Sequence, residues 1–232
     1  MSLLFIGIFA FLSTLFGGYI AFKYKRFIHI FSGLTAGTLL ALIFIEIIPE
    51  VIKLNNSTYI LLTVIFGFIF FHILEKIFSL HHHHGEKHDH DHHDHISSKK
   101  IATWALILHS LFDGIAIGLA YNISPAFGLV VAIGVIAHDF SDGFNTVSLS
   151  NSKRLLCADA IAPILGIIIG SYFTFPDTIM SILFGLFAGV LLYVSTSDIL
   201  PEAHCDNKKH MTQNLLAMLA GVLYIVFVVS LK

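Results

Sequence analysis

Long apolar stretches alternate with short polar breaks along the whole 232-residue chain. Each stretch is close to the roughly 20 residues that an α-helix needs to cross the hydrocarbon core of a bilayer. The pattern therefore predicts an all-α membrane protein with eight transmembrane helices. Their expected ranges are 2–22, 30–51, 58–79, 101–121, 126–149, 155–175, 179–203 and 212–231.

Composition supports a protein whose solvent is the lipid bilayer. The chain is 56% hydrophobic and 12% charged, whereas a soluble domain has roughly 25% charged residues. We predict one transmembrane domain over 1–232, with no second folded domain and no nucleic-acid partner.

Lys and Arg residues concentrate in every second loop, which predicts the orientation of the chain. They follow spans one, three, five and seven, for example at Lys23, Lys76, Lys153 and Lys208, whereas the other loops hold only Lys53. Because positive loops stay in the cytoplasm, we expect both termini to be extracytoplasmic. The expected location is a cell membrane that the chain crosses several times.

Two similar runs lie in the middle of spans four and five: His109-Ser-Leu-Phe-Asp113-Gly and His138-Asp-Phe-Ser-Asp142-Gly. Residues four apart share one face of a helix, so each run presents an imidazole and a carboxylate together. The turn between the spans is short, so antiparallel helices would bring both pairs to the same depth. Two imidazoles and two carboxylates that converge there are typical of a divalent metal site.

The cost of burying acids supports the same interpretation. One Asp at the centre of a membrane helix costs roughly 2.5–3.5 kcal/mol, and Asp113, Asp139 and Asp142 all lie in such a position. A bound cation would offset that cost. The alternative is a network of hydrogen bonds that only joins the helices.

Spans two and seven resemble each other. Both place an acid nine residues after a glycine, Glu46 and Asp198, and both end in Pro-Glu. Because the two spans run in opposite directions, we predict an inverted repeat, which is common in transporters, with helices arranged 3+2+3. The expected transport route carries polar residues at its outer and inner mouths: Glu46, Glu50, Asp198, Glu202 and His204.

Three further polar residues lie near the central motifs. Asp159, early in span six, either reaches the central cluster from the side or lies near the cytoplasmic surface. Ser110 and Asp139 each follow a proposed ligand, about 100° around the helix. Ser110 and Asp139 would help to form an adjoining second metal position that shares Asp113 and Asp142.

The loop between spans three and four alternates histidines with aspartates. Such a composition builds no core, so we expect disorder over 81–99. Neutral imidazoles bind zinc and related ions, so the loop is either a cytoplasmic metal collector or a low-complexity linker. Its candidate ligands are His81, His82, His83, His84, His88, His90, His92, His93 and His95.

Taken together, the eight spans, the His-rich loop, the two central runs and the Pro-Glu endings resemble the ZIP (Zrt/Irt-like) metal transporters. The family patterns His-Asn-x-x-Glu-Gly and His-Glu-x-x-Glu-Gly read here as His109-Ser110-x-x-Asp113-Gly114 and His138-Asp139-x-x-Asp142-Gly143. The resemblance implies a primary site formed by His109, Asp113, His138 and Asp142, and a neighbouring one with Asp139 and Asp159. Ser110 stands where the family has Asn. Homodimers and transport toward the cytoplasm are further implications.

We therefore expect a transporter of divalent metal, Zn²⁺ first and Fe²⁺ or Mn²⁺ next, that needs no catalytic cofactor and is not an enzyme. One alternative is a cation-diffusion-facilitator exporter, which also has His-x-x-x-Asp helices but six spans. The other is an intramembrane metal-dependent hydrolase, which needs an open metal position for water.

Overall fold

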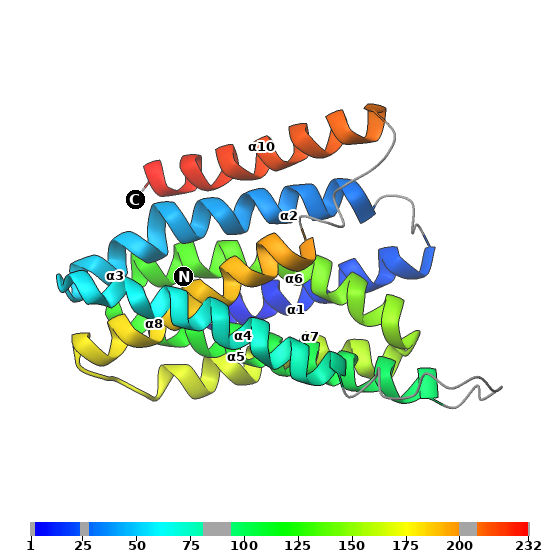
Figure 1. Cartoon of the computed structure of the whole chain (residues 1–232), viewed down its shortest axis with the longest axis horizontal. Helices are drawn as coiled ribbons and strands as arrows, with labels where there is room; N and C mark the ends of the chain where they lie inside the picture. Colours follow the sequence, from blue (N-terminus) through cyan, green and yellow to red (C-terminus); the bar gives the residue numbers. More distant parts are fainter. Residues whose placement is uncertain (1–2, 24–27, 81–93, 200–207, 232) are drawn as a thin grey trace.

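The computed structural model describes residues 3–23, 28–80, 94–199 and 208–231, and these segments are almost entirely helical (Figure 1). The helices lie roughly along one common axis. In chain order they are α1 (Leu3–Lys23), α2 (Ile28–Leu42), η2 (Ile43–Ile47), α3 (Ile48–Leu54), η3 (Thr58–Leu61), α4 (Leu62–Leu80), α5 (Asp94–Ile123), α6 (Pro125–Ser150), α7 (Lys153–Ser171), α8 (Asp177–Tyr193), η4 (Val194–Ile199) and α10 (Lys208–Ser230).

Within the described residues, seven helical segments are long and apolar enough to cross a membrane. The remaining expected span, 58–79, corresponds to η3 and α4, whose apolar stretch Thr58–Leu74 is shorter. The chain is an all-α integral membrane protein that crosses the bilayer several times. Helix α5 begins at Asp94, inside the 81–99 stretch for which the sequence predicts disorder, while 81–93 lie outside the described residues.

Short, well-capped turns join the helices that carry the two central motifs. Only Ser124 separates α5 from α6, and its Oγ accepts a hydrogen bond from the Phe127 amide at 3.1 Å. Pro125 occupies the first turn of α6, where a missing amide hydrogen costs little. At the other end of α6, Asn151 adopts a left-handed conformation that stops the helix. The two motif helices are therefore antiparallel neighbours.

The helices pack as two groups. The motif bundle consists of α1, α5, α6 and α7, and the companion bundle consists of α2 through α3, α4 with η3, α8 with η4, and α10. In Figure 1 the companion pair α2 and α10 lies along one edge, away from the pair α5 and α7. Each bundle thus combines helices from both halves of the chain, and the predicted 3+2+3 arrangement stays a prediction.

Close contacts in the motif bundle occur in equivalent pairs. Gly143 and Gly114 each follow the Asp of their motif, and a Cβ on either would overlap a backbone carbonyl, of Thr14 and of Pro163 respectively. Helix pairs α1–α6 and α5–α7 therefore approach each other in the same way.

The companion bundle repeats this correspondence in spans two and seven. A Cβ on Gly37 would overlap the Met218 carbonyl of α10, and a Cβ on Gly189 would overlap the Val64 carbonyl of α4. Both spans also contain a π-helix, η2 around Glu46 and η4 around Asp198. Such insertions are rare and often accompany functional sites. The equivalent contacts support the predicted inverted repeat.

Fewer close contacts join the two bundles to each other. Thr35 of α2 and Ser141 of α6 share a buried hydrogen bond of 2.9 Å. The Phe31 and Phe140 rings lie 4.3 Å apart between centroids. Beyond these contacts, α2 and α6 meet mainly through aliphatic side chains such as Leu42, which lies against Gly134.

Candidate metal centre

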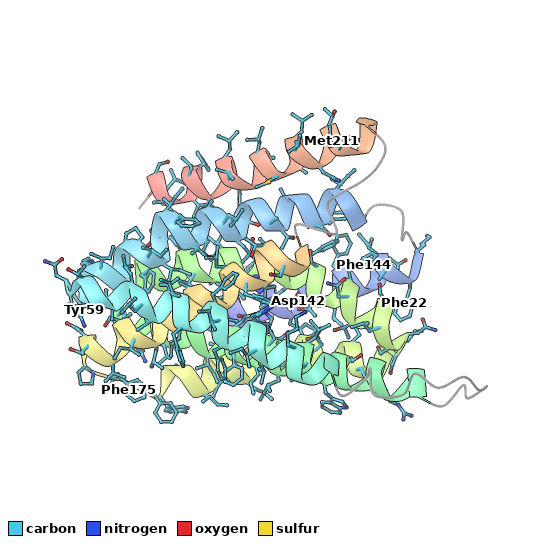
Figure 2. All side chains as sticks on the ribbon, viewed as in Figure 1. Phe22, Tyr59, Asp142, Phe144, Phe175 and Met211 are labelled. Atoms are coloured by element: carbon cyan, nitrogen blue, oxygen red, sulfur yellow. The ribbon has the colours of Figure 1, made fainter. Side chains whose placement is uncertain are left out.

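The two central motifs face each other across α5 and α6, and their proposed ligand atoms converge. One nitrogen or oxygen from each of His109, Asp113, His138 and Asp142 lies within 4.8 Å of all the others. Asp142 lies midway along the bundle, between Tyr59 and Phe175 at one end and Phe22 at the other (Figure 2). The cluster is thus at mid-depth of the helices.

Asp113 is at the centre of the cluster and is fully buried. Its Oδ2 lies 2.9 Å from His138 Nε2 and 3.3 Å from His109 Nε2, and His138 Nε2 lies 3.7 Å from Asp142 Oδ2. Ligand atoms around tetrahedral zinc are roughly 3.3 Å apart, because Zn–N and Zn–O bonds are about 2.0–2.2 Å long. The observed spacings bracket that separation, so small side-chain shifts would accommodate the ion.

The backbone orients His138 for this role. Its Nδ1 lies 3.3 Å from the Gly134 carbonyl one turn earlier, and since a carbonyl only accepts, Nδ1 donates. This leaves Nε2 directed at Asp113. A metal-binding imidazole usually donates its other N–H to such a partner, which fixes the ring and makes it a better ligand.

Several buried atoms of the cluster lack hydrogen bonds from the described residues. They are His109 Nε2, Asp113 Oδ1 and Asp142 Oδ2. Although His109 Nε2 is near Asp113, the pair lacks hydrogen-bond geometry. Unpaired polar atoms in a buried site are costly, and a divalent cation between the four side chains would satisfy His109 Nε2 and Asp142 Oδ2.

Asp159 lies beside this cluster, as one of the two sequence hypotheses expects, and its carboxylate is occupied by hydroxyl groups. Its Oδ1 accepts from Ser110 Oγ at 2.7 Å, and its Oδ2 accepts from Thr146 Oγ1 at 2.8 Å. Asp159 therefore joins α7 to α5 and α6. It is outside the group of four ligand atoms.

Asp139, on α6, is also fully buried, and neither of its carboxylate oxygens has a hydrogen-bond partner among the described residues. It follows His138 directly and so faces about 100° away from it around the helix. Its contribution to a second metal position stays a prediction.

The structure describes the side chains of only some of the expected route residues. Glu46 and Glu50 are both buried, and Lys53 Nζ lies 3.2 Å from Glu50 Oε1. The backbone of Asp198 belongs to η4, but its side chain is outside the described part of the structure, as are Glu202 and His204. Of the loop histidines, His95 is in α5 with its side chain undescribed, and the others lie outside the described residues.

Two aromatic residues near the site could not be identified from the sequence: Phe71 of α4, next to His109, and Tyr193 of α8, next to Phe71. The Phe71 ring lies 6.4 Å from the His109 ring and 5.6 Å from the Tyr193 ring. An aromatic residue has the same hydropathy whether its side chain faces lipid or a binding site. Hydropathy therefore could not distinguish these two residues from the lipid-facing aromatic residues.

Comparison with known proteins agrees with this geometry. A family model described as "ZIP Zinc transporter" matches residues 1–103 and 81–229. Zinc transporter ZIP9 of Xenopus tropicalis is 28% identical over 167 residues, covering 64% of this chain and 54% of that protein. Metal cation symporter ZIP8 of Rattus norvegicus is 29% identical over 107 residues, covering 41% of this chain and 22% of that protein.

The chain spans about half the length of the ZIP9 relatives that it matches. The family model, in contrast, matches nearly all of the chain, including both central motifs and the helices that hold them. The chain therefore belongs to the ZIP zinc transporter family.

Proposed function

We propose that the protein transports divalent metal cations, Zn²⁺ first and Fe²⁺ or Mn²⁺ next, across the membrane into the cytoplasm. The observation that carries the proposal is the buried convergence of two imidazoles and two carboxylates from α5 and α6 within 4.8 Å. Imidazole suits zinc and iron, whereas carboxylate suits harder ions such as manganese. Membership of a zinc transporter family supports this function over an exporter of another family or a hydrolase.

At this site His109, Asp113, His138 and Asp142 would hold the ion during transport. Binding would replace the hydrogen bond from His138 Nε2 to Asp113 with bonds to the metal, and Nε2 would release any proton it carries there. The Gly134 carbonyl would keep the imidazole in place throughout. Two positive charges that move inward gain roughly 4.6 kcal/mol per 100 mV of inside-negative potential.

A cavity at one end of the bundles supports an outer mouth near Glu50. Its volume is about 360 Å³, and its polar lining includes Glu50, Lys53, Asn122, Ser124 and Asp177. It is contributed by both bundles and is large enough for a hydrated ion. We propose that metal passes from this mouth through Glu46 to the central site, and then toward Asp198, Glu202 and His204.

The proposed orientation follows the basic residues. Lys53 is at the end of the bundle with the cavity, and Lys153 and Arg154 begin α7 after the turn that ends α6. With the positive-inside rule, the Lys153 end faces the cytoplasm and both termini are extracytoplasmic. A homodimer in a cell membrane remains part of the proposal.

Metal uptake into proteoliposomes tests the function. We expect time-dependent uptake of Zn²⁺ by the wild type, reduced by competing Fe²⁺ or Mn²⁺, and loss of uptake in His109→Ala, Asp113→Ala and Asp142→Ala. The matched control is Ser148→Ala, which changes an exposed position farther along α6. If all three site variants folded and transported at the wild-type rate, the cluster would be structural and the proposal wrong.

A further inference from the structure

Three aromatic side chains of the companion bundle, Phe68, Phe71 and Tyr193, form a cluster that reaches the His109 ring of the central site. Phe71 of α4 lies between His109 and Tyr193, with ring centroids 6.4 Å and 5.6 Å away. Phe68 packs edge-on against Tyr193, with centroids 5.2 Å apart. Since His109 belongs to the motif bundle, these rings lie where the two bundles meet beside the site.

A hydrogen bond anchors this aromatic cluster. The Tyr193 hydroxyl lies 3.1 Å from His72 Nδ1, so the two side chains are paired. Tyr193 is buried, whereas His72 is on the exposed side of α4. Ionisable residues in membrane helices rarely face lipid without a partner. The pair with Tyr193 explains how a histidine is accommodated there, and it restrains the tyrosine ring.

The aromatic cluster has no counterpart at the equivalent positions of the other repeat. Tyr193 is four residues after Gly189, and the residue four after the equivalent Gly37 is Ala41. Phe71 is four residues after Gly67, which meets the Leu186 carbonyl.

Gly221 of α10 is equivalent to Gly67. It meets the carbonyl of Leu34, and Leu34 and Leu186 each lie three residues before the glycines of spans two and seven. The residue four after Gly221 is Ile225, so aliphatic Ile225 and Ala41 stand where the other repeat has Phe71 and Tyr193. Both are buried. One repeat therefore has two large rings at these positions, and the other repeat has two smaller aliphatic side chains.

The position of Tyr193 in its helix shows toward which end of the transport route the rings lie. It ends α8 directly before η4, the π-helix that contains Asp198. We propose that Phe71 and Tyr193 form an aromatic gate between the central metal site and the inner end of the route, held shut by the bond between Tyr193 and His72. This inference rests on the proposed transport function. A hydrophobic constriction blocks a hydrated ion until its walls separate, so these rings must move away from the central site for metal to leave.

Thiol accessibility tests the gate without requiring transport. The starting chain has Cys157→Ser, Cys205→Ser and His109→Cys, so that its only thiol is at the site. A membrane-impermeant thiol reagent is applied from either face of oriented vesicles, and the modification rate is measured. Phe71→Ala removes one aromatic contact, and Tyr193→Phe removes one hydrogen bond. We expect either change to raise the rate from the Lys153 face by about two- to twelvefold, which is the change in population that follows from losing one contact of that strength. The rate from the other face should stay unchanged.

Phe66→Ala is the matched control, because Phe66 is on the same helix but 62% exposed, and it should leave both rates unchanged. Tyr193→Phe keeps the ring and removes only the hydroxyl, so it tests the gate even if Phe71→Ala fails to fold. Equal rates with and without Tyr193→Phe in folded protein, or a rise equal from both faces, would overturn the gate. Neither result depends on whether the protein moves metal.

Discussion

His109 and His138 occupy corresponding positions in their motifs but are held differently. His138 is fully buried, and hydrogen bonds restrain both of its ring nitrogens. The His109 side chain is 10% exposed, and its Nε2 lacks a hydrogen bond from the described residues. We infer that His138 and Asp113 form the fixed part of the site, whereas His109 adjusts when an ion binds or leaves.

Metal binding at this site should stabilise the folded protein. A ligand that binds only the folded state adds about 2.7 kcal/mol to the free energy of unfolding at 100 times its Kd. We therefore expect Zn²⁺ to raise the melting temperature of the detergent-solubilised wild type and to raise that of Asp113→Ala much less. The His-rich loop is present in both proteins, so the difference isolates the central cluster. Equal shifts in the two proteins would place the stabilising ion elsewhere.

The Asp159 network makes a separate prediction at the residue scale. Asp159→Ala leaves the buried Thr146 hydroxyl without its acceptor, whereas Ser110 Oγ keeps the Leu106 carbonyl at 3.1 Å. Since one buried donor is left unsatisfied, we expect the free energy of unfolding to fall by about 1–3 kcal/mol. Ser110→Ala leaves the bond from Thr146 in place and should cost less. Chemical denaturation in detergent without metal measures both changes. If Ser110→Ala instead abolished uptake at unchanged stability, Ser110 would be a metal ligand.

The sequence predicted the central pairs because their chemistry is local. A spacing of four residues fixes which side chains share a helix face, and a one-residue turn fixes how α5 and α6 meet. The partners of Asp159 depend on the rotation of three helices about their axes, which no spacing determines. Residue spacing also could not show that Phe71 lies next to the site whereas Phe66 is exposed, because this too depends on the rotation of a helix about its axis.

Among the elements, the glycine contacts set how closely the motif helices approach each other. Replacing Gly143 with Leu would drive a side chain into the backbone of Thr14. Overpacking of this kind costs about 1–3 kcal/mol, so we expect Gly143→Leu to unfold at lower temperature and to give less folded protein. Ala105→Leu, at an exposed position on α5, is the control and should behave like the wild type. Equal stability of the two variants would mean that α1 and α6 separate without cost.

The sequence also predicted the similarity of spans two and seven, but not its structural form. A matched acid, glycine and Pro-Glu ending indicated a repeat, and η2 and η4 turned out to be π-helical at those acids. A π-helical turn contains one residue more than an α-helical turn. The mean hydropathy of a 20-residue stretch hardly changes with one added residue, so it does not reveal such a turn. The same averaging explains why the pattern predicted spans without showing which of them pack together.

For the whole molecule, the contrast between contacts within and between the bundles indicates how it moves. Within each bundle, glycines bring backbones into direct contact. Between the bundles, α2 and α6 meet through side chains, among them the hydrogen-bonded pair Thr35 and Ser141. Backbones in direct contact leave no layer of side chains that can rearrange as the helices slide, whereas flexible aliphatic side chains between two helices can rearrange. We therefore expect each bundle to move as a unit against the other.

A cross-link between the bundles should stop this movement. Thr35→Cys with Ser141→Cys places two sulfurs where hydroxyl oxygens are 2.9 Å apart, close enough for a disulfide after a small adjustment. We expect oxidation to abolish metal uptake into proteoliposomes and reduction to restore it. The control pair is Thr63→Cys with Gly185→Cys, which joins α4 to α8 inside the companion bundle. Oxidation of that pair should leave uptake unchanged, since both helices move together. Uptake by the fully cross-linked protein at the rate constant of the same protein after reduction would contradict this prediction. The bundles would then not need to separate at α2 and α6, and release would depend on local movements such as those of Phe71 and Tyr193.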